Sequence, residues 1–121
     1  MKEETKRWIA QAEEDFASAQ ATLRIGQLKV ASFLCQQTVE KALKALLIDM
    51  TGTFPKIHDL VRLGRLASLE ASLLKECERL TFVYVESRYP DTSNRKYTTK
   101  ETTADLASAK KMLTWVQKKL S

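Results

Sequence analysis

Lys56, His58 and Asp59 form the first group of side chains that could do chemistry, in a short polar stretch that follows Pro55. A lysine and a histidine just ahead of a helix could lie at the rim of a phosphate site, because helix N-termini favour anions. The alternative is structural: Asp59 caps the helix, and His58 fixes the turn through hydrogen bonds. The sequence leaves both interpretations open.

Arg88 and Tyr89 form the second group. Pro90 disfavours a helical conformation at the residue before it, so a helix is expected to end near Tyr89. The planar guanidinium of Arg88 could then clamp an anion, and Tyr89 or Tyr97 could offer an aromatic face to a base. In the alternative, Arg88 is a surface residue that pairs with a nearby carboxylate.

The second group lies in a basic stretch, because residues 87–100 hold four basic residues, among them Arg95, against one aspartate. A short basic loop of this kind can attract phosphates. We therefore predict one binding site that joins the first two groups, with Arg95 adding charge at its rim. Its ligand would be a nucleotide or an RNA phosphate.

The third group comprises Gln37, Glu40, Lys41 and Lys44, next to Gln36, on one amphipathic segment in the middle of the chain. Charged helix faces are commonly just solvated. These residues could instead form a polar seam with a neighbouring helix or with a second subunit.

Other kinds of chemistry have little support in this sequence. It contains no glycine-rich phosphate loop and no nucleophile or zinc-protease motif. The chain has one histidine and two isolated cysteines, Cys35 and Cys77, which are expected to be buried, reduced thiols. We expect no metal, no cofactor and no catalytic residue.

The composition bounds the class of protein. The chain has 121 residues, of which 44% are hydrophobic and 29% are charged, with a net charge of +5. That length is typical of one domain, here residues 1–121. No apolar run is long enough to cross a membrane, and the charged N-terminus does not resemble a signal peptide, so a cytoplasmic protein with no membrane partner is expected.

Apolar residues recur at helical spacing through nearly the whole chain. The stripe of the first segment consists of Trp8, Ala12, Phe16, Ala19 and Leu23. Gly26 permits a turn, a second helix is expected from about Leu28 to Met50, and Gly52 ends it. A short helix should follow Asp59.

The remainder is also predicted to be helical. A fourth helix is expected from about Leu69 to Glu86, and the last should open at Thr102, which with Asp105 resembles a capping box. The fold class is therefore all-α: an antiparallel four-helix up-down bundle with one additional short helix.

A symmetric homodimer is also predicted, because the second helix has apolar residues outside its main stripe. One helix cannot direct all of them at a single narrow core. They are Val30, Phe33, Val39, Leu43 and Leu47.

Four motifs, in order along the chain, resemble one family. The first is Trp8 followed by Ala-Glu-Glu-Asp at 12–15, and the second is Gln-x-x-Glu-Lys-x-Leu-Lys-Ala-Leu-Leu at 37–47. The third is Pro-Lys-x-His-Asp-Leu at 55–60, and the fourth is Tyr-Val-x-Ser-Arg-Tyr-Pro-Asp at 84–91. Together they resemble the HEPN domain, the higher eukaryotes and prokaryotes nucleotide-binding domain.

The resemblance implies a helical bundle that is commonly a homodimer. It also implies, for a small prokaryotic member, a minimal nucleotidyltransferase as partner in a toxin–antitoxin-like module. Many members are metal-independent ribonucleases with an arginine followed after four to six residues by a histidine. That signature is absent here, since Ser93, Asn94 and Arg95 occupy the positions where the histidine would follow Arg88. We therefore expect binding rather than cleavage, with an atypical ribonuclease toxin as the alternative.

Overall fold

The computed structural model describes residues 1–88 and 97–121, and side chains for 1–81 and 97–121. The described residues form five helices and no strand. The helices are α1 (Glu3–Arg24), α2 (Leu28–Thr51), α3 (Leu60–Leu66), α4 (Ala71–Arg88) and α5 (Thr99–Leu120). The predicted all-α class, with four long helices and one short one, is confirmed.

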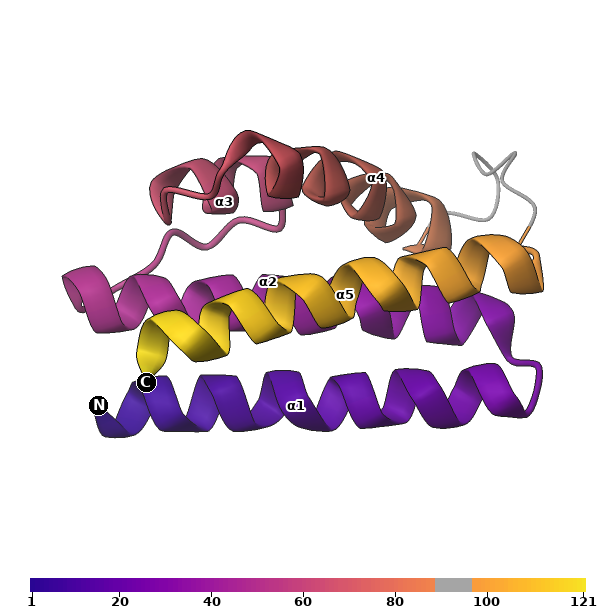
Figure 1. Ribbon diagram of the computed structural model, residues 1–121, viewed down its shortest axis with the longest axis horizontal. Helices are drawn as coiled ribbons and strands as arrows, with labels where there is room; N and C mark the ends of the chain where they lie inside the picture. Colours follow the sequence, from indigo (N-terminus) through magenta and orange to yellow (C-terminus); the bar gives the residue numbers. More distant parts are fainter. Residues whose placement is uncertain (89–96) are drawn as a thin grey trace.

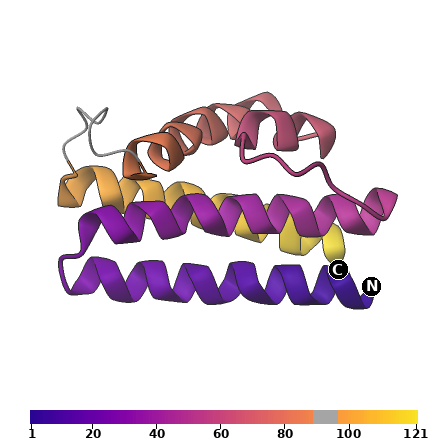
Figure 2. The ribbon, with the colours of Figure 1, turned by 180° about the vertical axis from the view of Figure 1, so that it is seen from behind.

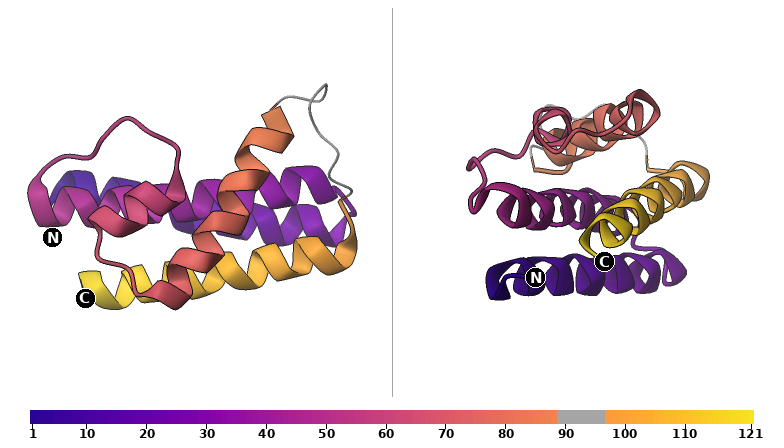
Figure 3. Two further views of the ribbon diagram at one scale, coloured as in Figure 1. Left: turned by 90° about the horizontal axis from the view of Figure 1, so that it is seen from above. Right: turned by 60° about the vertical axis from the view of Figure 1, so that its left-hand side comes forward.

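The helices stack in three layers (Figure 1). α1 forms one outer layer, α2 and α5 form the middle one, and α3 with α4 forms the other outer layer, as the reverse view also shows (Figure 2). α2 and α5 run in the same direction, opposite to α1, and the two termini lie at the same end. α4 crosses obliquely over α2 and α5 (Figure 3).

α2 is the central helix, because it packs against each of the other four. Val39, Leu43 and Leu47 are therefore buried within the chain itself. This weakens the sequence-based argument for a dimer. Three of the five apolar residues outside the main stripe of this helix are covered by their own chain. Val30 is 46% exposed at the other end of the helix.

The residues that end α2 and cap α3 act as expected. Gly52 follows α2 in the left-handed conformation at φ 88°, where a side chain would be strained. Asp59 caps α3, and its carboxylate accepts hydrogen bonds from the backbone N–H groups of Val61 and Arg62. Both predictions are confirmed.

The predicted start of the last helix is wrong. α5 begins three residues earlier, and the hydroxyl of Thr98 accepts a hydrogen bond from the backbone N–H of Glu101. Thr98 and Glu101 repeat the capping spacing that Thr102 and Asp105 also show. Thr102 and Asp105 are instead fully buried inside the helix, where their side chains meet α2.

One apolar core joins all five helices, from Ala12 on α1 to Val116 on α5. Cys35 and Cys77 are free thiols within it, as predicted, and burial raises the pKa of each to about 12. In the described part of the chain, no helix has the length and apolar character that a membrane crossing requires.

The Leu113→Asp variant tests this core. Leu113 is 6% exposed, so the aspartate would bury an unpaired charge and remove a packed side chain. We expect a loss of at least about 4 kcal/mol of unfolding free energy, or no cooperative unfolding at all. Thr114→Asp, at the exposed neighbouring position, is the matched control. Equal thermal melting of the two variants by circular dichroism would contradict the assigned packing.

Candidate functional site

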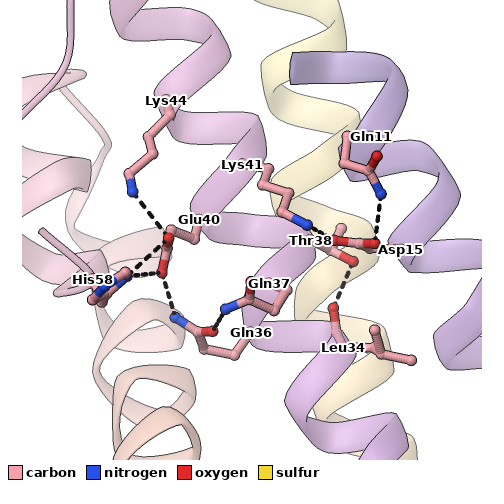
Figure 4. Close-up of polar contacts among 10 residues, drawn as sticks. All are labelled: Gln11, Asp15, Leu34, Gln36, Gln37, Thr38, Glu40, Lys41, Lys44 and His58. Atoms are coloured by element: carbon pink, nitrogen blue, oxygen red, sulfur yellow. Dashed lines mark hydrogen bonds and ion pairs between the residues drawn. The ribbon is translucent and has the colours of Figure 1, made fainter. Parts of the chain in front are cut away.

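Glu40 is the centre of a buried polar cluster on α2 (Figure 4). Its side chain is only 6% exposed. Gln36 donates from Nε2 to Oε1 at 3.1 Å, and Lys44 donates from Nζ to Oε2 at 2.9 Å. These residues lie one turn before and one turn after Glu40, so the helical period brings all three together. Gln37 extends the cluster by donating to Gln36 Oε1 at 2.7 Å.

His58 supplies the contact from outside the helix. Its Nδ1 lies 3.1 Å from both carboxylate oxygens of Glu40. A carboxylate can only accept, so Nδ1 carries the proton and donates, which fixes the tautomer of the neutral ring. The His58 side chain is nevertheless 51% exposed. Glu40 therefore orients an imidazole that solvent, or a ligand, can reach.

Glu40 stays ionised in spite of its burial. Burial alone would raise the pKa of its carboxyl, but the hydrogen bonds from Lys44, Gln36 and His58 together outweigh it. The pKa of Glu40 is therefore lower than its ordinary value. The cluster contains a true ion pair, in which the negative charge of Glu40 balances the positive charge of Lys44.

Two aromatic rings enclose the Lys44 ammonium. Its Nζ lies 5.1 Å from the ring centroid of Phe54 and 5.9 Å from that of Trp8. The two rings meet edge to face, with centroids 4.8 Å apart. A cation over aromatic rings is stabilised, more so when it is shielded from water. Lys44 thus ties α1 and the segment after α2 to Glu40.

The segment between α2 and α3 is anchored at its other end to α4. The backbone N–H of Leu60 donates to the hydroxyl of Thr81 at 3.0 Å. Lys56 lies on this segment two residues before His58, and it is exposed. Lys56 and His58 therefore lie on one segment, and that segment leads to the contact between Leu60 and the middle of α4.

The N-terminus of α3 does not offer backbone groups to an anion. The N–H of Leu60 is bonded to Thr81, and those of Val61 and Arg62 are bonded to the Asp59 carboxylate. A phosphate at this position would have to be held by side chains. The structural role of Asp59 and a ligand role for His58 are therefore both compatible with the fold.

Arg88, Tyr89 and Arg95 are the other predicted site residues. Arg88 is the last residue of α4, but its side chain is not among those that the structure describes. Tyr89 and Arg95 lie outside the described residues. The α4 backbone carries Arg88 two turns, or about 10 Å, beyond Thr81.

Lys41 faces away from Glu40, so the predicted polar seam divides in two. Its Nζ lies 2.5 Å from Asp15 on α1, and Gln11 donates to the same carboxylate at 3.0 Å. Figure 4 shows the two clusters on different sides of α2. Both clusters make contacts within the chain, one toward α3 and the other toward α1.

The burial of another carboxylate, Asp105, was not predicted. Asp105 accepts a hydrogen bond from Ser32 of α2 at 2.8 Å and pairs with Arg79 of α4. Arg79 also donates to the carbonyl of Ala104 at 3.0 Å. This cluster joins α2, α4 and α5. The available signal was that Ser32 and Asp105 fall beside the apolar stripes of their helices.

No metal site is evident in the described part of the chain, where no three His, Cys, Asp or Glu side chains group in a way that could hold an ion. The chemistry available around Glu40 is therefore that of an oriented imidazole, an exposed lysine and a neutralised ion pair.

The sequence matches the HEPN domain family over residues 5–119. That is nearly the whole chain, so this protein belongs to the HEPN family, as the four motifs indicate. A search of curated proteins finds no significant match.

Two crystal structures are similar over nearly their full length. One is TT1696 from Thermus thermophilus, with 29% identity and a TM-score of 0.87, covering 98% of this chain and 99% of that one. The other is ST0689, an archaeal HEPN homologue, with 32% identity and a TM-score of 0.84, covering all of both chains. The fold is therefore shared with the archaeal HEPN homologue ST0689 and with TT1696.

The Glu40–Lys44 pair can be tested by removing one or both charges. Glu40→Gln leaves a buried ammonium without its partner, so we expect the free energy of unfolding at pH 7 to fall by about 3–5 kcal/mol. Glu40→Gln/Lys44→Met removes both charges and should recover most of that loss. Glu14→Gln, at an exposed position on α1, is the control. Urea unfolding measures all four proteins.

The same experiment has a pH dependence. Because folding lowers the pKa of Glu40, its charge stabilises the protein above the ordinary value of 4.5 and ceases to do so as the pH falls through the lower, folded-state pKa. The gap between wild type and Glu40→Gln should shrink over that range. A gap that does not change with pH, or a double variant as unstable as the single one, would contradict this account of the cluster.

Proposed function

We propose that this HEPN protein binds the phosphate groups of a nucleotide or RNA without cleaving them. The binding face comprises Lys56 and His58, together with Arg88, Tyr89 and Arg95 from the end of α4 and the residues after it. The observation that carries this proposal is the half-exposed His58 ring, which the buried Glu40 holds in one orientation.

Electrostatics supports an anionic ligand. Lys44 balances Glu40 inside the protein, so the carboxylate does not leave a net negative charge beneath His58. The exposed Lys56 then adds a positive charge on the same segment. Protonated His58 can donate from Nε2 as well as from Nδ1. Charge-assisted hydrogen bonds from such groups to phosphate are among the stronger ones in proteins.

A titration of labelled oligouridylate or nucleotide tests this site. Each charge-assisted bond is worth about 1.5–3 kcal/mol, so His58→Ala and Arg88→Ala should each weaken binding by roughly tenfold or more. Lys56→Ala should weaken it less, and higher salt should weaken binding to the wild type. Lys29→Ala, another exposed lysine on a different segment, is the control. Equal affinities for wild type, His58→Ala and Arg88→Ala would contradict the proposal.

An atypical ribonuclease is the second candidate, and the Glu40–His58 pair favours it specifically. Neutral His58 with its proton on Nδ1 could accept a proton at Nε2 from a ribose 2′-OH. The 2′-oxygen would then attack phosphorus and expel the 5′-oxygen, which takes up a proton, leaving a 2′,3′-cyclic phosphate. RNA fragments produced by wild type, but not by His58→Ala, would establish this candidate in place of binding alone.

We further propose that the protein acts as a homodimer and as the partner of a minimal nucleotidyltransferase in a toxin–antitoxin-like module. Membership of the HEPN family supports the partner, since small members commonly occur with such an enzyme. Exposed apolar side chains at the α1–α2 end support the dimer: Ile25 is 73% and Val30 is 46% exposed.

Light scattering tests the dimer. At micromolar concentration we expect a mass of about twice the 13.8 kDa chain. Val30→Asp should lower that mass toward the monomer, because a charge at a self-complementary contact is buried twice. Lys29→Asp, at the preceding exposed position, is the control. A monomeric wild-type protein would contradict the dimer.

A further inference from the structure

The outer face of α5 carries an uncompensated positive charge. From Leu106 to Ser121 the chain contains four lysines and no acidic residue. The lysines form two pairs, Lys110–Lys111 and Lys118–Lys119, and all four are exposed. They lie about one turn before and one turn after Trp115, so they surround it on the helix. α5 lies at the front of the molecule in Figure 1.

Two of these lysines have partners and two do not. The Nζ of Lys111 lies 3.7 Å from a carboxylate oxygen of Glu76. The Nζ of Lys119 lies 5.2 Å from the ring centroid of Trp115. Lys110 and Lys118 form no ion pair with any residue in the described part of the chain. Their charges are available to an external partner.

Trp115 separates two open depressions in the surface. One, of about 530 Å³, lies along α5 and is lined by Lys110, Thr114 and Lys118 among others. The other, of about 280 Å³, lies between α2, α5 and the end of α3, where Met50 and Ala67 line it.

The lining of the smaller depression is largely apolar. Leu46, Met50, Ala67 and Trp115 line it, and Met50 is 52% exposed. An apolar depression with a polar rim commonly marks a binding surface. A ligand that fills this depression must bring apolar groups of its own.

We propose that this surface, which we call the α5 face, binds an acidic amphipathic segment of a partner protein. The α5 face comprises Met50, Ala67, Lys110, Trp115 and Lys118. Apolar side chains of the segment fill the depression between Met50, Ala67 and Trp115. Its carboxylates pair with Lys110 and Lys118. An amphipathic helix that lays its apolar side into a groove is a common mode of peptide recognition.

The details of the α5 face favour a protein segment over single-stranded nucleic acid. A base needs an open aromatic face to stack on, but Trp115 is half-buried and the Lys119 ammonium lies over its ring. Asp49 lines the smaller depression and would repel a phosphate chain there, whereas an apolar anchor carries no charge. None of the residues in this surface belongs to the proposed phosphate site.

Fluorescence anisotropy with a defined peptide tests the proposal. The probe is a labelled helical peptide of about 16 residues, with leucines at i, i+3, i+4 and i+7 spacing and glutamates elsewhere. We expect it to bind wild type with a Kd of tens of micromolar. Lys110→Glu/Lys118→Glu should weaken binding by at least tenfold, and Met50→Ser by several-fold.

The matched control is Lys29→Glu/Lys100→Glu, which changes the net charge equally at two other exposed lysines. Its affinity for the peptide should lie within about twofold of the wild-type affinity, because charges far from the α5 face are screened by salt. A scrambled peptide of the same composition should bind more weakly than the probe.

Four results would overturn the proposal. The first is no binding of the probe to wild type. The second is equal weakening of binding by the two charge-reversal variants. The third is equal affinity for the probe and the scrambled peptide. The fourth is that labelled oligouridylate binds more tightly than the probe and depends on Lys110 and Lys118, which would make the α5 face a nucleic-acid surface.

Discussion

Glu40 carries a negative charge into the interior on α2, the helix that each of the others contacts. A buried carboxylate is costly unless hydrogen bonds and an opposite charge surround it. Here Lys44 supplies the charge, and Gln36 and His58 supply further hydrogen bonds. Satisfying this one group therefore fixes where the segment between α2 and α3 must lie.

The consequences extend to the neighbouring elements. Lys44 in turn needs shielding, which Trp8 of α1 and Phe54 provide. The contacts with Glu40 hold His58 against α2. Asp105 of α5 is a similar anchor. Arg79 of α4 pairs with its carboxylate, and Ser32 of α2 donates a hydrogen bond to it. These two carboxylates join α3 and α4 to the middle layer, and a third buried carboxylate, Asp15, joins α1 to α2 through Lys41.

Local signals in the sequence were sufficient to locate most of the helices. Apolar spacing located the long helices, Gly52 ended α2, and Asp59 capped α3, because each effect involves residues within one or two turns. The predicted start of α5 was wrong because two pairs of residues offer the same capping pattern, Thr98 with Glu101 and Thr102 with Asp105. Only contact with Ser32, 73 residues away from Asp105, distinguishes them, and a local pattern cannot show it.

The same limit applied to the site. The sequence identified His58 and Glu40 as polar residues worth attention, but in separate groups, because they are 18 positions apart in the chain. Their pairing depends on how the chain returns over α2. The burial of Val39, Leu43 and Leu47 also depends on packing, since α2 is covered from several sides rather than from one.

The proposed function depends most on the half-exposed His58 ring, which Glu40 holds in one orientation. His58 is the only histidine in the chain, so its ring nitrogens give a single pair of signals in a long-range ¹H–¹⁵N NMR spectrum. We predict that Nδ1 is protonated in the free protein and stays so, and that oligouridylate shifts the Nε2 signal. A neutral ring protonated on Nε2, or a spectrum unchanged at saturating oligouridylate, would contradict this account.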